Sequence, residues 1–151
     1  MDTDDVDGEL TVAHYASGGV LYHAATRQVL LQHRTDDAPA YPGQWGLFGG
    51  GEEPEDGGDP VATFRRELGE ELGVTLDPAL LRSLGKTTGR NGAPRHLYAY
   101  PWPAPSRDFV LGEGQGFAWF TIDEALSLTL LIPLAAECLL LLVVALRDGA
   151  P

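Results

Sequence analysis

The order of apolar and polar positions along this chain predicts strands mixed with helices. Runs rich in β-branched and apolar residues predict strands over 11–23, 28–33, 44–48, 81–86, 95–100 and 116–120. Helices are expected over 60–72, 123–127 and 134–146. Only Ala24 to Arg27 separate the first two strands, which indicates a hairpin. Strands and helices mixed in one short chain are typical of an α/β sandwich.

The helix expected over 60–72 carries signals at both ends. Asp59 suits the N-cap, Pro60 suits the first helical position, and Gly73 suits the left-handed residue that ends a helix. One apolar face is formed by Val61, Phe64, Leu68 and Leu72. Gly69 costs about 1 kcal/mol relative to alanine inside a helix, so we expect another segment to approach it closely.

Length and charge limit the kind of protein this is. With 151 residues and 16.2 kDa the chain forms one domain, which we place at 11–147 after an acidic, disordered arm at 1–10. A net charge of −12 repels phosphate backbones and argues against duplex nucleic acid as a partner. The lone Cys138 forms no internal disulfide, so we expect a reducing, cytoplasmic location.

The apolar stretch 128–146 has the length of a membrane span, but two residues interrupt it. Pro133 and Glu137 leave only nine uninterrupted residues, Cys138 to Leu146. This favours a helix that is buried or faces a second copy of the chain over a membrane anchor. The apolar run 139–144 is too wide for one helix face, which makes a homodimer the corresponding expectation.

Three glutamates on the 60–72 helix are the strongest chemical signal in the sequence. Glu67 lies three residues before Glu70 and four before Glu71, so the carboxylates share a face. A hard divalent cation such as Mg²⁺, with Mn²⁺ as the alternative, would neutralise their repulsion. A solvated acidic face is the other interpretation. The glycines at 49–51 favour the cation, because they let the backbone approach a bound phosphate.

The segment from Gly50 to Val74 resembles the Nudix box. That signature reads Gly, five residues, Glu, seven residues, then Arg-Glu-apolar-x-Glu-Glu-x-Gly-apolar, and residues 66–74 match its last part throughout. Flanking segments at 30–34, 42–50, 119–120 and 123–126 are also similar to the family. The resemblance implies an α/β/α sandwich with a central mixed sheet. It also implies hydrolysis of a diphosphate linkage in a small nucleoside diphosphate derivative, with carboxylate-bound Mg²⁺.

The resemblance also implies roles for individual residues. Glu70 and Glu71 would bind metal, Glu67 would bind metal or help to deprotonate the attacking water, and Arg66 would orient them. Glu113, in a glycine-rich loop late in the domain, is a candidate for a further metal ligand. We expect substrate contacts from four residues, namely Gly50, Gly51, Arg34 and Trp45. Nucleoside triphosphates, nucleotide sugars and ADP-ribose-like compounds all remain open as substrates.

The first half of the box departs from the signature. Gly58 stands where counting back from Arg66 requires Glu, as though Glu55 and Asp56 had been inserted. Either the loss slows the reaction, or Glu53, Glu55 or Asp56 reaches in from the longer loop. A nucleotide-binding regulatory protein of the same fold, without catalysis, is therefore the alternative to an enzyme.

Overall fold

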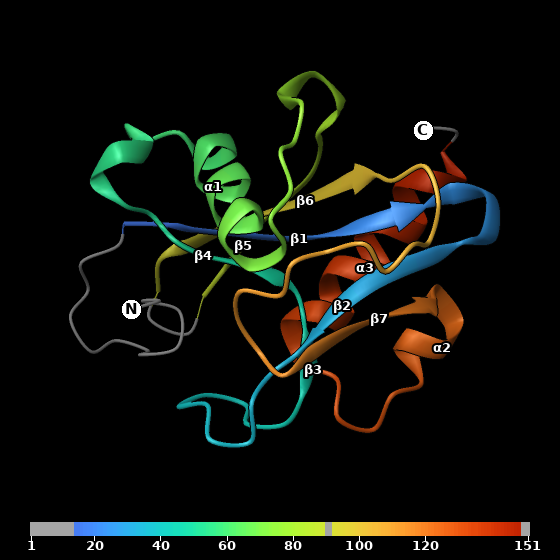
Figure 1. Ribbon diagram of the computed structural model, residues 1–151. Coiled ribbons are helices and arrows are strands. Elements are labelled where there is room, and N and C mark those ends of the chain that lie inside the picture. Colours follow the sequence, from blue (N-terminus) through green and yellow to red (C-terminus); the bar gives the residue numbers. More distant parts are fainter. Residues whose placement is uncertain (1–13, 90–91, 149–151) are drawn as a thin grey trace.

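The computed structural model describes residues 14–89 and 92–148, and within them a mixed seven-stranded sheet forms the centre (Figure 1). The strands are β1 (Ala16–His23), β2 (Gln28–His33), β3 (Trp45–Gly46), β4 (Phe48–Gly51), β5 (Arg82–Thr88), β6 (Pro94–Pro101) and β7 (Gly116–Thr121). Their main order is β3-β2-β1-β6-β5, with β4 beside β1 and β7 beside β2. Only the pairing of β1 with β6 is parallel among those described.

Helices cover both faces of this sheet, so the predicted α/β/α sandwich is confirmed. Helix α1 (Pro60–Leu72) lies on one face, and α2 (Ile122–Leu126) and α3 (Pro133–Arg147) lie on the other. Neighbouring residues of β2 divide between the two cores: Leu30 packs in the α1 layer, whereas Val29 and Leu31 pack in the α3 layer. This alternation buries β2 on both sides.

Helix α1 begins and ends where its capping residues predict. The Asp59 side chain accepts a hydrogen bond from the Val61 N–H at 3.0 Å, and Gly73 ends the helix with φ of 72°. The expected close approach at Gly69 is wrong. A Cβ there would meet only the Val74 carbonyl oxygen at 3.5 Å, which is ordinary contact.

The strand expected over 44–48 is two short strands in the structure. Strand β3 pairs with β2, whereas β4 pairs with β1 and includes the three glycines. Gly49 has φ of 140°, and a Cβ there would collide with the Ser17 carbonyl oxygen, so β4 can lie this close to β1 only with glycine. The described residues also form the 3-10 helices η2 (Ala24–Thr26), η3 (Pro54–Asp56) and η4 (Pro78–Leu80). The acidic arm predicted at 1–10, and residues 11–13 of the first expected strand, lie outside the described residues.

Helix α3 buries one side of its apolar sequence and exposes the other. Cys138, Leu139 and Leu142 are fully buried, whereas Leu140 is 55% and Val144 is 43% exposed. Burial raises the pKa of the Cys138 thiol to about 12. In the part of the chain that the structure describes, no helix combines the length and the apolar character needed to cross a bilayer. The homodimer remains a prediction.

Candidate active site

Two of the predicted glutamates are buried on the sheet-facing side of α1. Glu67 is 5% and Glu71 is 2% exposed, one helical turn apart. Glu113 comes from the β6–β7 connection and joins them: one carboxylate oxygen of each lies within 4.8 Å of the others. Glu70 is outside this group and is 54% exposed. Three carboxylates converging on one point, two of them buried, fit the oxygen ligands that a hard divalent cation requires.

Strand β4 shapes the space around these carboxylates. The Gly49 N–H donates a hydrogen bond to Oε1 of Glu71 at 2.9 Å. A Cβ on Gly50 would lie 2.5 Å from Oε2 of Glu67, so this position accepts glycine and Glu67 fills the space instead. At Gly50 the glycine loop thus approaches a carboxylate of α1, and its approach to a bound phosphate stays a prediction.

The loop that carries Glu113 is held at both ends. On one side the Gly112 N–H donates to the Glu71 carbonyl at 2.9 Å, and a Cβ on Gly112 would collide with the Glu70 carbonyl oxygen. On the other side Gln115 donates from its backbone N–H to the His33 carbonyl at 2.8 Å and from Nε2 to the Arg34 carbonyl at 2.7 Å. Glu113 is thus presented from a loop fixed to α1 and to β2.

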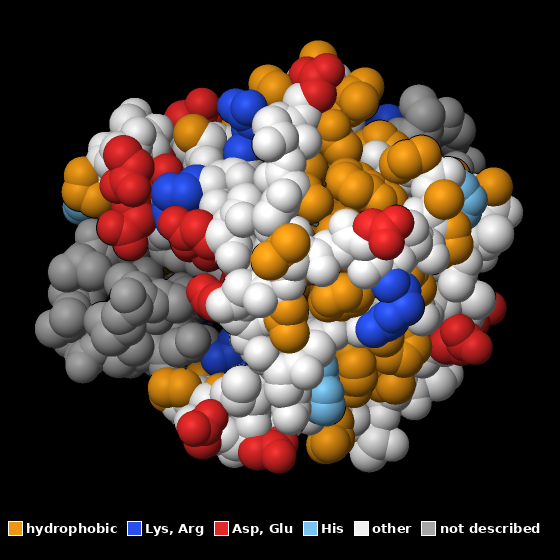
Figure 2. Space-filling view, in the orientation of Figure 1, with side chains coloured by type: hydrophobic (Ala, Val, Ile, Leu, Met, Phe, Trp, Pro, Cys, Tyr) orange, Lys and Arg blue, Asp and Glu red, His pale blue; other side chains and the backbone are white. Residues whose placement is uncertain are grey.

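Arg66 links the carboxylates of α1 to the loop before the helix. Its Nε donates to Oδ1 of Asp56 at 2.9 Å and one terminal nitrogen donates to Oδ2 at 3.0 Å. The other terminal nitrogen lies 3.1 Å from Glu67 and 3.3 Å from Glu70. The hydrogen bond with Asp56, more than any other contact, raises the pKa of Arg66 above its ordinary value. The predicted orienting contacts of Arg66 are present, and Figure 2 shows acidic and basic side chains gathered over α1 and the segment before it.

Asp56 is the buried partner of this arginine. Burial by itself raises the pKa of Asp56, but hydrogen bonds from Arg66, from the Glu53 N–H and from the Thr63 hydroxyl outweigh it and hold the pKa below its usual value. Of the three acids that could replace the missing box glutamate, only Asp56 makes this contact with Arg66; Glu55 is exposed.

The position of Asp56 also corrects the alignment of the box. Asp56 follows Gly50 after five residues, which is the spacing that the signature gives to its first Glu. The two additional residues are therefore Gly57 and Gly58, not Glu55 and Asp56. Gly57 and Gly58 have φ of 64° and 77°, and a Cβ on either would meet nothing within 4 Å. They form an open turn between Asp56 and the N-cap of α1.

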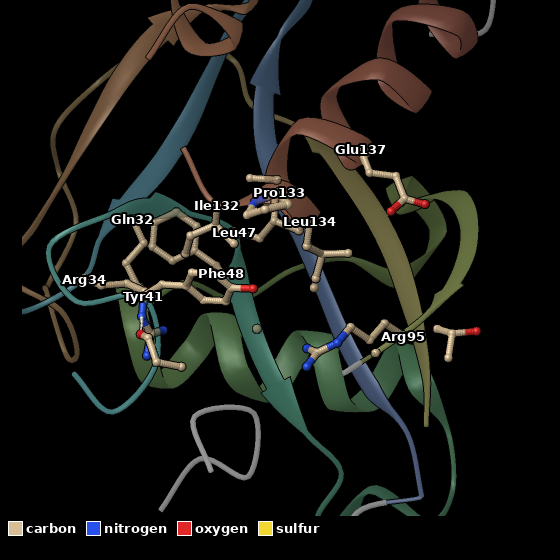
Figure 3. Close-up of a pocket in the computed structure, with 16 residues that line it drawn as sticks. Gln32, Arg34, Tyr41, Leu47, Phe48, Arg95, Ile132, Pro133, Leu134 and Glu137 are labelled. Atoms are coloured by element: carbon tan, nitrogen blue, oxygen red, sulfur yellow. Dashed lines mark hydrogen bonds between the residues drawn. The ribbon is translucent and has the colours of Figure 1, made fainter. Parts of the chain in front are cut away.

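The predicted substrate residues separate into three groups. Arg34 lines a cavity of about 280 Å³ beside β4, together with Gln32, Arg95 and the first turns of α3 (Figure 3). Gly51 accepts a hydrogen bond from Arg66 at 3.0 Å and, like Gly50, lies against α1. Trp45 stacks on His33 with ring centroids 4.3 Å apart and does not line this cavity. Gln32 and Gln115 are not among the site residues predicted from the sequence, although Gln32 lies in the 30–34 segment that is similar to the family.

Comparison with known proteins agrees with this geometry. The sequence model of the NUDIX domain matches residues 12–141. Nudix hydrolase 3 of Arabidopsis thaliana is 41% identical over 56 residues, which are 37% of this chain but 7% of that protein. Nucleoside triphosphatase NudI of Enterobacter sp. (strain 638) is 30% identical over 112 residues, 67% of this chain and 78% of that protein.

Solved structures share the fold. The solution structure of the E. coli ORF135 protein has a TM-score of 0.66 at 24% identity, with 91% of this chain and 92% of that chain covered. The NUDIX domain of Shewanella oneidensis NrtR, complexed with ADP ribose, has a TM-score of 0.67 at 18% identity, with 87% of each chain covered. The chain is thus an α/β/α sandwich with a carboxylate cluster on a glycine-flanked helix. It belongs to the Nudix family.

Proposed function

We propose that this protein is a Mg²⁺-dependent hydrolase of the diphosphate linkage in nucleoside diphosphate derivatives. The observation that carries the proposal is the convergence of Glu67, Glu71 and Glu113 within 4.8 Å. A buried cluster of like charges is costly unless a cation compensates it, and Mg²⁺ in proteins commonly uses carboxylates together with substrate phosphates. Mn²⁺ meets the same requirements and is the alternative ion.

The residues of the site divide the work of such a reaction. Glu67, Glu71 and Glu113 would hold the cation, with Glu70 as the further ligand that the family signature implies. When bound, the cation would lower the pKa of a water molecule and offset the charge of the diphosphate. The water oxygen forms a new bond to phosphorus and the bridging P–O bond breaks, with its electron pair leaving on the departing phosphate. The proton of the water passes to a carboxylate of the cluster, and Glu67 would take this role in place of metal binding if Glu71 and Glu113 hold the cation without it.

Arg66 and Arg34 would act on either side of this step. Arg66 holds Glu67 and Glu70 in place through contacts of 3.1 and 3.3 Å. Arg34 lines the cavity next to the cluster and offers a guanidinium that suits phosphate oxygens. Its Nε is already used by the Ala40 carbonyl at 2.9 Å, which fixes the side chain in the loop after β2.

The substrate class is drawn from three groups. NudI is named as a nucleoside triphosphatase, and the NrtR domain holds ADP ribose. Nucleoside triphosphates, ADP-ribose-like compounds and nucleotide sugars therefore form the test panel. The contact between Asp56 and Arg66 supports catalysis over the purely nucleotide-binding alternative, because that alternative rested on a missing acid. Cytoplasmic location remains our expectation.

The test is an incubation of the purified protein with this panel, with Mg²⁺, with Mn²⁺ and with chelator, followed by identification of products by mass. We expect a nucleoside monophosphate that appears only with metal, and the member that yields it names the substrate class. Nucleotide binding without turnover of any member in either metal would contradict the proposal and favour the binding protein. Glu71→Gln serves as the inactive control for contaminating activity.

A further inference from the structure

Gln32 is a buried glutamine whose side chain makes no hydrogen bond to the part of the chain that the structure describes. It is the fifth residue of β2 and is 4% exposed. Among residues 14–89 and 92–148 its carboxamide makes no hydrogen bond, although Gln115, His33 and Arg34 nearby are all engaged. Among the described residues, the Gln32 carboxamide is not one of the fully enclosed polar atoms left without a partner, so it reaches the open space of the cavities that it lines. A ligand in these cavities can therefore accept a hydrogen bond from it.

Gln32 lies where two cavities meet. The first, of about 280 Å³, is largely apolar on the side formed by Leu47, Phe48 and Ile132. The second, of about 220 Å³, lies between residues 35–39 and the Glu113 loop. Gln32 and Arg34 line both cavities. Figure 3 shows Gln32 on the side of the first cavity that also carries Arg34.

Both cavities border the carboxylate cluster. Gly49, in the wall of the first, donates its N–H to Glu71 at 2.9 Å. Glu113, in the wall of the second, is itself a member of the cluster. Gly114 packs against the Gln32 side chain, since a Cβ there would lie 3.1 Å from its Cγ. A ligand that extends from one cavity into the other therefore passes Gln32 beside the three carboxylates.

We propose that Gln32 is a substrate-binding residue that donates its carboxamide N–H to a phosphoryl oxygen of the diphosphate. This inference rests on the proposed function and adds the residue that holds the group to be cleaved. Phosphoryl oxygens only accept hydrogen bonds, and Gln32 and Arg34 together supply a neutral and a charged donor from one strand end. A neutral donor suits this position because it adds no negative charge next to the cluster, as a glutamate would.

Binding of magnesium methylenediphosphonate tests the assignment, because this probe has no base or sugar and water does not cleave its P–C–P bridge. By titration calorimetry we expect Gln32→Leu to weaken binding about tenfold or more. Gln32→Glu should weaken it further through repulsion of the phosphonates. The matched control is Gln28→Leu: Gln28 lies on the same strand, accepts a hydrogen bond from Thr26 at 2.6 Å and lines neither cavity. It should bind like the wild type.

Thermal unfolding separates this role from a structural one. Gln32→Leu removes an amide that makes no hydrogen bond to any described residue, so its unfolding midpoint should equal or exceed that of the wild type. A lower midpoint with unchanged affinity would make Gln32 a structural residue and overturn the inference. So would wild-type affinity in Gln32→Leu, or a wild-type protein that does not bind the probe. A loss confined to free nucleosides would assign Gln32 to the base and overturn it equally.

The proposed function can fail independently of this inference. If the wild type binds the diphosphonate through Gln32 but hydrolyses no member of the nucleotide panel, catalysis is refuted and the diphosphate contact stands. If the panel is hydrolysed and Gln32→Leu is unaffected in diphosphonate binding and in kcat/KM, the role of Gln32 is refuted and the proposed catalysis stands.

Discussion

Asp56 and Arg66 are joined by two hydrogen bonds, from Nε to Oδ1 at 2.9 Å and from a terminal nitrogen to Oδ2 at 3.0 Å. Because this contact is bidentate, the other terminal nitrogen of Arg66 is available to donate to Glu67 and Glu70. One arginine therefore connects the loop after β4 to two carboxylates of α1. The Asp56 side chain is 2% exposed, so this connection is shielded from solvent.

Replacement of Asp56 by asparagine should lower stability in a pH-dependent way. Asp56→Asn removes the charge that Arg66 faces, and we expect the free energy of unfolding at pH 7 to fall by about 2 kcal/mol. The folded-state pKa of Asp56 is depressed, so its contribution is complete above the ordinary aspartate value of about 3.9 and is lost as pH falls through the folded pKa. The difference from wild type should therefore narrow below about pH 4. Urea unfolding at pH 7, 4 and 3 measures it.

Glu55→Gln is the control for this prediction. Glu55 is the neighbouring acid in η3 and is exposed, so its loss should leave stability unchanged at every pH. Equal effects of the two substitutions, or a difference that grows in acid, would contradict the role given to the pair.

Placing a glutamate at position 58, where counting back from Arg66 puts the glutamate of the family signature, should not increase activity. A side chain at Gly58 starts in open space, away from Arg66, and its φ of 77° disfavours any residue with a Cβ. We expect Gly58→Glu to lose about 1 kcal/mol of stability and to gain no activity. If Gly58→Glu is more active than the wild type in the same hydrolysis assay, position 58 and not Asp56 is the place of the box carboxylate.

Local signals made α1 predictable, because its limits depend on residues next to one another. Asp59, Pro60 and Gly73 act through the backbone of the helix that they bound, so their effect is visible in the sequence. The sharing of a face by Glu67 and Glu71 follows from helical geometry alone. The strands on either side of η2 were also predictable from the sequence, because only a short hairpin connection separates them; Arg27, with φ of 53°, closes it.

Other parts of the site depend on contacts between distant segments. Whether Asp56 or Gly58 faces Arg66 depends on the path of the loop. The spacing of five residues between Gly50 and Asp56 nevertheless matches the signature and could have identified Asp56. The grouping of Glu113 with the α1 carboxylates, without Glu70, depends on how the β6–β7 connection docks. Trp45 is expected from the sequence to contact substrate, whereas its ring packs against His33 and Phe120.

The two adjacent glutamates of α1 should differ in importance. Glu71 is buried in the cluster, and Glu71→Gln should reduce turnover by roughly a thousandfold, since several kcal/mol of charge stabilisation are lost. Glu70→Gln should lose less, because Glu70 is 54% exposed and lies outside the cluster. Initial rates at saturating Mg²⁺ give the comparison, and circular dichroism verifies the fold. A larger loss of turnover for Glu70→Gln than for Glu71→Gln would contradict this assignment and place the metal nearer to the exposed Glu70.

Two glycines on and beside α1 offer a paired test of how Glu113 is held. Gly69→Ala adds a methyl group in open contact on an exposed helix position, so it should stabilise the protein by up to about 1 kcal/mol and leave turnover unchanged. Gly112→Ala places the same methyl group against the Glu70 carbonyl oxygen, which no rotamer change can relieve, and should push the loop off α1. The hydrogen bond from the Gly112 N–H to the Glu71 carbonyl would then be lost. As a result, Glu113 would leave its position beside the carboxylates of α1.

The readout that isolates this effect is the Mg²⁺ concentration that gives half-maximal rate. For Gly112→Ala we expect it to rise roughly tenfold or more, as is usual when a group that orients a metal ligand is removed. Gly69→Ala should keep the wild-type value. The two substitutions are chemically identical, one within α1 and the other in the loop packed against it. An unchanged Mg²⁺ dependence in Gly112→Ala would therefore mean that Glu113 does not act at the metal. A rise in both variants would instead trace the effect to α1 itself.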